Sequence, residues 1–292
     1  MAINLNLYNR IINLKIYREN NKPLLITCPT KGRKPKIELS GNLYANGDIP
    51  AFNLTIKNLY LDLKDDVYTK IEVEAGYDGC TAKLEGSIIT IYQEEPGPEG
   101  TTYIQCGESS MSDWLDAYVN VEFTKGTYLA QALAKITKGM DLKGIRMGDK
   151  ATNLSLPEDF SHTGTARDAF IKLKKIFQNN YLVIFARNNI LTALCLTESD
   201  YINVHTLKYM SAPLQFNTGG DSSGTYYATV SAPWDPSLQP GDMLIIPSMV
   251  YQRYGERIGT DTGSQKIEVQ SIEFHFGTCG GTNSMKVQGY LI

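Results

Sequence analysis

Residues that could do chemistry gather in the stretch "IEVEAGYDGCTAKLEGSIITIYQ", which begins at residue 71. Glu72 and Glu74 alternate with apolar residues there, and Cys80 follows closely. A glycosidase needs two carboxylates, one of which has its pKa raised by apolar surroundings so that it can act as a general acid. In a strand, however, Glu72 and Glu74 share the wet face of the sheet. The pattern therefore favours the polar face of a strand over a catalytic pair.

Five cysteines could supply a nucleophile or metal ligands. They are odd in number and widely spaced, with no C-x-x-C pair, which predicts reduced thiols rather than disulfides or a zinc site. Cys279, in "GTCGGTN", is the one that lies in a turn-like sequence. Because a partner histidine can be distant in the chain, the sequence leaves a Cys–His pair open, although nothing supports one. The five are Cys28, Cys80, Cys106, Cys195 and Cys279.

The three histidines, His162, His205 and His275, lie in three different segments, and no H-E-x-x-H or H-x-H motif is present. The segment "GGDSSG" at 219–224 has no following Lys-Ser or Lys-Thr and no helix after it, which favours a hairpin tip over a phosphate loop. We therefore predict no catalytic residue, no metal ligand and no cofactor. The protein is expected not to be an enzyme.

The composition indicates an ordinary globular protein of 292 residues, with 42% hydrophobic and 20% charged residues. A net charge of -3 argues against nucleic-acid binding as the main function, because phosphate binding needs a basic face. The short basic run that starts at Lys31 contains Gly32 and Pro35 and is interpreted as a solvated loop. No apolar run approaches the roughly 18–20 residues that span a bilayer. The N-terminus lacks an apolar core, so we expect no signal peptide and synthesis in a cytosol.

Residues 1–123 have the pattern of antiparallel strands. Ile3, Leu5 and Leu7 alternate with polar residues, as do Ile71 and Val73, and turn signals such as "ANGDIP" separate the strands. Residues 124–200 change character. Leu129, Leu133, Ile136 and Met140 form a helical stripe with Thr127 as its expected N-cap and Gly139 at its end. A second helix has Thr165 as its expected N-cap, and a hairpin linked by Asn188-Asn189 follows.

Residues 201–292 return to strands, in the segments "GTYYATVSAP", "GDMLIIPS", "SQKIEVQSIEFHFG" and "SMKVQGYLI". In the third, Ile267 and Val269 set one apolar phase, whereas Ile272 and Phe274 set the other. This slip predicts a β-bulge near Gln270-Ser271. We predict a mainly β protein: two antiparallel β-barrels, 1–123 and 201–292, around a small α/β module of two helices and a hairpin, 124–200.

The succession "NLTIKNL", "VYTKIEVEAGYDG", "AKLEGSIITIYQ", an acidic Pro/Gly loop and "TTYIQCGE" resembles the N-terminal barrel of tail or baseplate hub proteins of tailed bacteriophages. This late-control-D-like family also occurs in contractile injection systems. Ala75-Gly76-Tyr77 matches its corner and Gly86-Ser87-Ile88 its "G-x-I" step. "GTYLAQALAKITKGM", "TARDAFIKLKKIF" and "DPSLQPGDML" extend the resemblance over most of the chain. Because this sequence is shorter than those of many hubs, we expect no additional peripheral domain and no appended lysozyme-like domain.

The resemblance implies a structural, non-enzymatic hub of the virion, made in the host bacterial cytoplasm. Such a hub is a homotrimer in which each subunit contributes two tail-tube-like barrels, and it adapts a sixfold tail tube to a threefold tip and lines the DNA channel. Its expected partners are the tail tube protein and a spike, tip or tape-measure protein, with transient, non-specific passage of DNA. A mildly acidic chain is compatible with DNA sliding past.

The alternative is a carbohydrate- or receptor-binding β module of a phage or bacterial surface apparatus, which the 18 tyrosines and several exposed-looking loops suggest. The loops are "EEPGPEG", "GGDSSG" and "GTDTGSQ". Their candidate interaction residues are Glu94, Glu95, Pro96, Gly97, Glu99, Gly219, Asp221, Ser222, Thr260 and Asp261.

Overall fold

The structure is a computed structural model, and most of the chain is placed well enough to describe. The described residues are 9–28, 35–45, 51–94, 100–107, 116–140, 142–187, 190–195, 203–207, 219–220, 226–246, 251–253, 256–258, 265–278 and 283–291.

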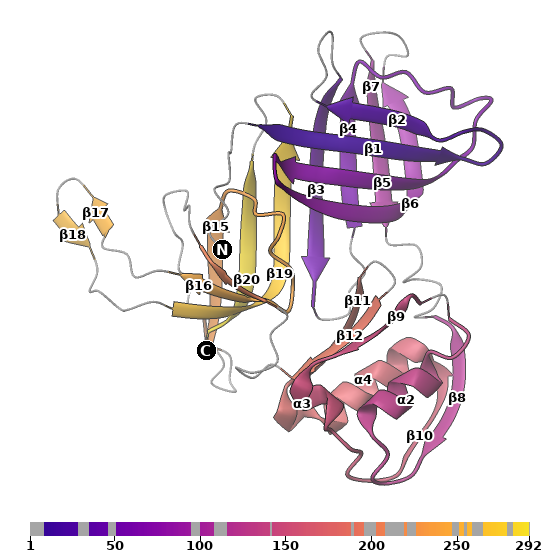
Figure 1. Cartoon of the computed structure of the whole chain (residues 1–292), viewed down its shortest axis with the longest axis vertical. Coiled ribbons are helices and arrows are strands. Elements are labelled where there is room, and N and C mark those ends of the chain that lie inside the picture. Colours follow the sequence, from indigo (N-terminus) through magenta and orange to yellow (C-terminus); the bar gives the residue numbers. More distant parts are fainter. Residues whose placement is uncertain are drawn as a thin grey trace.

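Strands dominate the chain, and the helices lie in its middle part (Figure 1). The first strands are β1 (Arg10–Arg18), β2 (Leu24–Cys28), β3 (Lys36–Tyr44), β4 (Ala51–Lys57), β5 (Tyr68–Tyr77), β6 (Cys80–Glu94) and β7 (Thr101–Gly107). The middle part holds β8 (Tyr118–Phe123), α2 (Leu129–Ile136), β9 (Gly144–Met147), α3 (Asp149–Thr152), β10 (Phe160–Thr165), α4 (Ala166–Ile176), a 3-10 helix (Gln178–Asn180), β11 (Leu182–Arg187) and β12 (Ile190–Cys195). The last part holds β13 (Val204–Thr206), β14 (Gly219–Gly220), β15 (Tyr226–Ala232), β16 (Met243–Ile246), β17 (Tyr251–Arg253), β18 (Glu256–Ile258), β19 (Gln265–Gly277) and β20 (Ser284–Leu291). The predicted class, mainly β with a small α/β module, is confirmed.

The first seven strands form two layers that share the long strand β6. Its first half continues to β5, β1 and β2, whereas its second half pairs with β7, which leads to β4 and β3. A register shift between Ile88 and Thr90 marks the bend. Gly86 beside it allows close packing, because a Cβ there would lie 2.9 Å from the Phe52 ring. The apolar faces of both layers therefore meet in one core.

The expected closure into two barrels is wrong. β19 pairs antiparallel with β3, so strands from both ends of the chain join in one 13-stranded sheet. The main hydrogen-bonded path runs from β14 to β2 and does not close among the described residues. One buried cluster holds both Ile12 and Val230, from opposite ends of the chain. Alternation predicted the apolar face of each strand, but it carries no information on which edge the strand pairs with.

The predicted bulge in β19 is confirmed. The register with β20 shifts between Val269 and Ser271, and the strand pairs with β16 before this point and with β3 after it. The carbonyl of Gln270, at the shift, accepts a hydrogen bond from the Ala45 N–H at 2.8 Å. The bulge thus lets one strand serve two parts of the sheet.

The Ala75-Gly76-Tyr77 corner connects β5 to the C-terminal strands. Gly76 has φ +152°, and a Cβ there would lie 2.3 Å from the Cys80 carbonyl oxygen. Tyr77 is fully buried, packs edge-on against Phe276 at 5.5 Å and accepts a hydrogen bond from the Asn283 amide. Gly76 and Gly79, on either side of this corner's end, both have positive φ.

The middle part has its own buried cluster, formed by two small sheets and the helices. β8 pairs with β10, and the predicted hairpin strands β11 and β12 are joined by β9, which runs parallel to β12. Strands β9 and β10 and helix α3 were not predicted. The hairpin link Asn188-Asn189 lies outside the described residues. The three proposed domain ranges stay predictions, although β8 packs with the middle part.

The two expected helix caps have different outcomes. The Thr165 hydroxyl accepts a hydrogen bond from the Asp168 N–H at 3.2 Å and donates to its carboxylate at 2.9 Å, so this N-cap is confirmed. Thr127 is not the cap of α2, because the helix begins one residue later, after Tyr128, and the Thr127 hydroxyl donates to the Thr124 carbonyl. The stripe Leu129, Leu133 and Ile136 is buried as predicted.

The four predicted C-terminal strands are β15, β16, β19 and β20. The short strands β13, β14, β17 and β18 were not predicted. Ile3, Leu5 and Leu7 lie outside the described residues. In the described part of the chain, no helix is both long and apolar enough to cross a bilayer.

Candidate functional site

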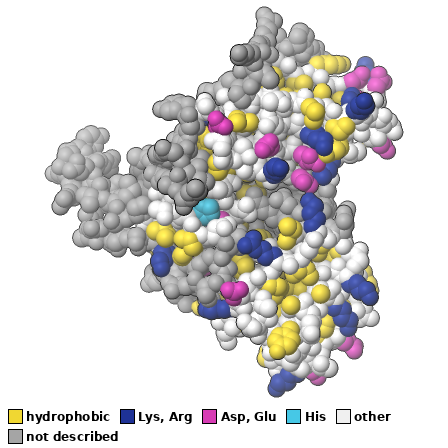
Figure 2. Space-filling view, in the orientation of Figure 1, with side chains coloured by type: hydrophobic (Ala, Val, Ile, Leu, Met, Phe, Trp, Pro, Cys, Tyr) yellow, Lys and Arg dark blue, Asp and Glu magenta, His cyan; other side chains and the backbone are white. Residues whose placement is uncertain are grey.

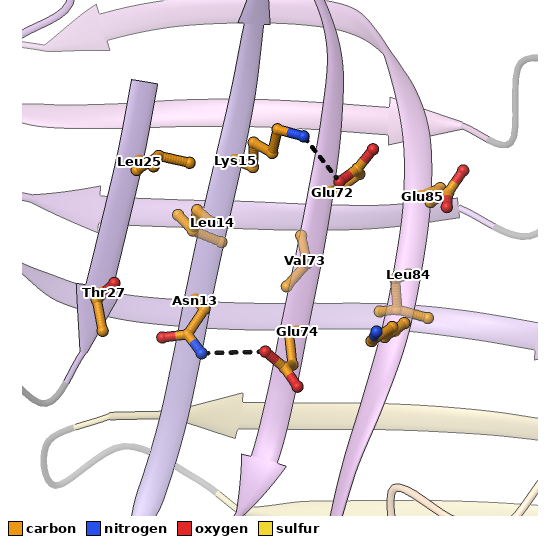
Figure 3. A pocket seen from close by; sticks show the side chains of 11 residues that line it. Asn13, Leu14, Lys15, Leu25, Thr27, Glu72, Val73, Glu74, Leu84 and Glu85 are labelled. Carbon is orange, nitrogen blue, oxygen red and sulfur yellow. Dashed lines mark hydrogen bonds and ion pairs between the residues drawn. The ribbon is translucent and has the colours of Figure 1, made fainter. Parts of the chain in front are cut away.

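The outer face of β2, β1, β5 and β6 carries a shallow groove of about 340 Å³ (Figure 3). Antiparallel register places its side chains in two rows that cross the four strands. The first row is Thr27, Asn13, Glu74 and Lys83, and the second is Leu25, Lys15, Glu72 and Glu85. The buried neighbours Leu14, Val73 and Leu84 point to the core from the same strands.

Glu72 lies at the centre of the second row. It accepts a hydrogen bond from the Tyr17 hydroxyl at 2.6 Å, and the Nζ atoms of Lys15 and Lys70 lie 3.7 and 3.6 Å from its carboxylate oxygens. The Tyr17 hydrogen bond, together with the charges of the two lysines, lowers the pKa of Glu72. Its carboxylate is therefore held in the ionised form, which is the opposite of what a general acid requires.

Glu74, in the first row, is held in a similar way. The Asn13 amide donates to it at 3.1 Å and the Thr81 hydroxyl at 3.0 Å, and these hydrogen bonds lower the pKa of Glu74. The Asn13 Oδ1 atom is buried and has no hydrogen-bond partner among the residues that the structure describes. The sequence-based rejection of a catalytic Glu72–Glu74 pair thus has a physical basis in these hydrogen bonds.

Glu85 extends the charged network toward the middle part of the chain. Lys70 Nζ lies 3.1 Å from its carboxylate, and Lys143 Nζ, in the segment before β9, lies 3.8 Å from it. Burial alone would lower the pKa of Lys70, but the hydrogen bond and charge of Glu85 raise it. The face is thus covered by cross-strand ion pairs, an arrangement that suits solvent or a polar protein surface.

Only two of the predicted interaction residues fall in the described part of the chain. Glu94 ends β6, and its carboxylate accepts a hydrogen bond from the Tyr103 hydroxyl at 3.0 Å; the Tyr103 ring stacks on Tyr92 at 4.8 Å. Gly219 pairs with Tyr227 in the short β14–β15 ladder. Neither Glu94 nor Gly219 lines the groove. The remaining residues, which lie outside the described ranges, are Glu95, Pro96, Gly97, Glu99, Asp221, Ser222, Thr260 and Asp261.

Three of the four described cysteines are buried. Cys28, Cys106 and Cys195 are buried, and burial raises the pKa of the Cys106 thiol to about 12. Cys80 is half-buried, and Cys279 lies outside the described residues. Thiolate chemistry needs a lowered pKa, so Cys106 is not a candidate nucleophile.

The three histidines occupy unrelated positions. His275 is exposed beside Glu273, with 3.6 Å between Nε2 and the carboxylate. His162 is buried on β10 and contacts the Thr165 carbonyl. His205 lies 3.1 Å from the fully buried Asp242, which ties β13 to the start of β16. Among the described residues, no three or more His, Cys, Asp or Glu side chains form a group that could hold a metal ion.

No protein-family model and no curated protein match this sequence. Solved structures do. The tail protein from Neisseria meningitidis MC58 matches with a TM-score of 0.58 at 11% identity, covering 97% of each chain. The 43 kDa tail protein of prophage MuSo2 from Shewanella oneidensis matches with a TM-score of 0.56 at 10% identity, covering 96% of this chain and 97% of that one.

A third match is the E. coli c3393 protein, a component of the type VI secretion system that resembles the T4 bacteriophage tail proteins gp27 and gp5. The TM-score is 0.61 at 9% identity, over 96% of this chain and 76% of that one. This chain has the fold of these proteins.

Within this tail-protein fold, sequence reasoning found the glutamates of the charged face but missed their partners Asn13, Lys15 and Tyr17. A signal for them was present, because the β1 sequence "INLKIYR" alternates as regularly as β5. What the sequence does not contain is the register that sets Lys15 beside Glu72, which depends on pairing across more than fifty residues.

Proposed function

We propose that this chain is a structural component of a phage tail or baseplate, and more specifically its hub. In this proposal it is a homotrimer that adapts a sixfold tail tube to a threefold tip or spike and lines the DNA channel. Its partners are then the tail tube protein and a tip, spike or tape-measure protein. It is made in the host bacterial cytoplasm and resides in the virion.

The observation that carries the proposal is the full-length correspondence with solved tail proteins. Two of them align with this chain over 96–97% of its length and 97% of their own. A match of this extent includes both the joined sheet and the α/β part. Sequence identity of 10–11% is low enough that the fold, rather than a shared ligand site, is what they have in common.

A non-enzymatic role is part of the proposal. It is supported by the ionised, fully paired state of Glu72 and Glu74 and by the raised pKa of Cys106. The charged outer face is better suited to contact with a polar surface than to chemistry. The loops that motivated a carbohydrate-binding alternative lie largely outside the described residues.

The test is to delete the coding sequence in the phage that encodes it and to examine the particles by electron microscopy. The proposal is supported if the deletion abolishes complete tails and an epitope-labelled copy expressed in trans restores them. The label should then be found at the tip end of the tail. Particles with normal tails and no labelled subunit would contradict it. Native mass spectrometry of the purified chain tests the trimer separately.

A further inference from the structure

The chain passes from one part of the molecule to the other and back. Residues 116–195, which contain β8 to β12 and the helices, are called the module here, and the rest of the described chain is called the body (Figure 1). β13 is the first described strand after the module, so it is where the returning chain is fastened to the body. It has three residues and, among the described strands, pairs only with β16. So short an edge strand gains little from its own ladder, and side chains decide how firmly it is held.

Charged side chains are spread over the surface of both parts (Figure 2), but the pair that holds β13 is largely withdrawn from it. Asp242, just before β16, is fully buried, and the His205 side chain is 18% exposed. The Asp242 Oδ2 atom accepts a hydrogen bond from the Gln239 N–H at 2.8 Å, and its Oδ1 atom accepts one from the Asn203 amide at 3.2 Å. Asp242 therefore connects the turn before β16 to the start of β13.

His205 approaches the same carboxylate from the middle of β13. Its Nε2 atom lies 3.1 Å from Asp242 Oδ2, which is within ion-pair distance. This nitrogen is buried and has no aligned hydrogen-bond partner among the described residues. A neutral ring therefore leaves the nitrogen unsatisfied, whereas a protonated ring forms a mostly buried ion pair with Asp242. The charge on His205 thus decides how strongly β13 is held.

The charged groups around His205 favour its protonated form. Asp235, in the segment before β16, adds a second negative charge to that of Asp242. The strand register places Lys266 and Glu268 of β19 on the opposite face of the sheet from His205. Burial lowers the pKa of His205, but contact with Asp242 and the charges of Asp242 and Asp235 raise it overall above the ordinary value of 6.5.

We propose that His205 and Asp242 form a proton-controlled latch, which fastens β13 to β16 when His205 is protonated and releases it when His205 is neutral. With β13 released, the module depends more heavily on its small contact with the body through Ala45, Phe185 and Leu194. The latch therefore controls how firmly the module is attached. This inference goes beyond the proposed function and does not rest on it, because the latch belongs to the chain whether or not the chain is a hub.

The direction of the pH dependence follows from the raised pKa of His205. The stability that the latch contributes is fully present below the ordinary pKa of 6.5, and it is lost as the pH rises through the higher pKa of the folded chain. β13 should therefore be fastened in mildly acidic solution and released in alkaline solution. Burial also raises the pKa of Glu268, so its ionisation weakens this sheet in the same direction and has to be separated by the choice of variants.

Hydrogen–deuterium exchange measures the latch, because two backbone amides report on the contact between β13 and β16. The Met243 N–H donates to the Asn203 carbonyl at 2.9 Å, and the Leu207 N–H donates to the Ile245 carbonyl at 2.8 Å. After correction for intrinsic exchange rates, the protection of these amides in wild type should fall at least about threefold from pH 6 to pH 9. Amides of β1 and β5 should keep their protection, which shows that the body stays folded.

His205→Asn keeps a polar side chain that cannot be charged, so the two amides should be weakly protected at both pH values. Glu268 is present in this variant and in wild type, so its titration contributes equally to both. The matched control is His275→Asn, on β19, where the side chain is 52% exposed beside Glu273; it should keep the wild-type pH dependence. Asp242→Asn removes the other charge and should behave like His205→Asn.

The histidine ring signals in NMR spectra give an independent measurement. The His205 signal is the one that is missing from the His205→Asn spectrum, and in wild type it should titrate with a pKa above 6.5. In a folded Asp242→Asn variant, the pKa of His205 should fall, because burial then acts without the neighbouring carboxylate. If Asp242→Asn does not fold, His205→Asn and the wild-type titration still test the latch.

Four results would overturn the inference. These are a pKa of His205 at or below 6.5, amide protection at Met243 and Leu207 that does not change with pH in wild type, a His205→Asn variant with the wild-type pH dependence, and a His275→Asn control that loses as much protection as His205→Asn. The last result would show that the effect comes from the charge of the whole chain rather than from the pair.

Discussion

Glu268 has the most unusual environment of the described acidic side chains. It lies on β19 beside the bulge, is 3% exposed and accepts a hydrogen bond from the Gln270 amide. Burial raises the pKa of Glu268 to about 8, and the hydrogen bond from Gln270 lowers it in part. The ionised form is therefore disfavoured in the folded chain, and the carboxyl group holds its proton in neutral solution.

Glu268→Gln should remove a pH-dependent loss in the free energy of unfolding. The ordinary pKa of a glutamate is 4.5. The folded chain keeps a proton that the unfolded chain releases as the pH rises above that value, so the wild-type free energy of unfolding falls until the pH passes about 8. The variant lacks this fall and should be more stable than wild type above pH 8 by roughly 2–4 kcal/mol. Denaturant unfolding from pH 5 to 9 measures it.

The matched control for this measurement is Glu273→Gln, on the same strand but 51% exposed. It should follow the wild-type pH profile. If Glu268→Gln also keeps the wild-type profile, the carboxyl group is not buried in the way described.

Gly76→Ala should be strongly destabilising. The new Cβ would meet the Cys80 carbonyl oxygen at 2.3 Å, at a backbone φ of +152°. A backbone atom cannot move aside cheaply, so a loss of roughly 2–4 kcal/mol in the free energy of unfolding is expected. Gly79→Ala separates the two causes: φ is +83°, but nothing lies within 4 Å of the new Cβ, and about 1 kcal/mol is expected. Equal losses at both positions would argue against the clash.

At the residue scale, the sequence was sufficient to predict a side chain's position where that position depends only on neighbouring residues in the chain. The position of Glu72 and Glu74 on the polar face of β5 follows from strand alternation. The burial of Glu268 does not. It stands in the same alternating run as Lys266 and Gln270, and the neighbours that cover it come from strands distant in the sequence. A buried acid of this kind has no sequence signature.

At the element scale, the two threonines before the helices give a direct comparison. Thr165→Ala removes the hydroxyl that accepts the Asp168 N–H, and the free energy of unfolding should fall by about 1 kcal/mol. Thr127→Ala should cost less than about 0.5 kcal/mol, because its hydroxyl contacts the Thr124 carbonyl and caps no helix. Urea unfolding followed by circular dichroism measures both. A larger effect at Thr127 would contradict the assignment of Tyr128 as the N-cap position.

The sequence was sufficient to predict most element types, but it did not predict which strands pair edge to edge. The phase slip between Val269 and Ile272 was sufficient to predict the β19 bulge, because a strand has a period of two and a slip must be absorbed by an extra residue. The pairing of β19 with β3 was not predictable, because the backbone groups at a strand edge are the same in every sequence. β9 was also missed, since its four residues, Gly144–Met147, are too few to show a period.

At the scale of the whole molecule, the chain has two large cores with a small contact between them. One cluster fills the joined sheet, and the other fills the module. In the described part of the chain, the buried residues that link them are Ala45, at the end of β3, and Phe185 and Leu194, on the hairpin. The Lys143–Glu85 ion pair adds a polar contact at 3.8 Å. Contacts of this size hold two domains together less firmly than each core holds itself.

Unfolding should therefore proceed in two transitions, one for each core. Leu173→Ala empties a fully buried position in the module, and Leu54→Ala does the same in the sheet. Each should cost about 2–5 kcal/mol in its own core. In calorimetry, Leu173→Ala should lower only the module's transition temperature and Leu54→Ala only the sheet's, since the linking cluster is too small to couple them fully. A single transition that both substitutions shift by the same amount would show that the two cores unfold as one unit. The contact through Phe185 would then be stronger than its size indicates, and Phe185→Ala should split the transition.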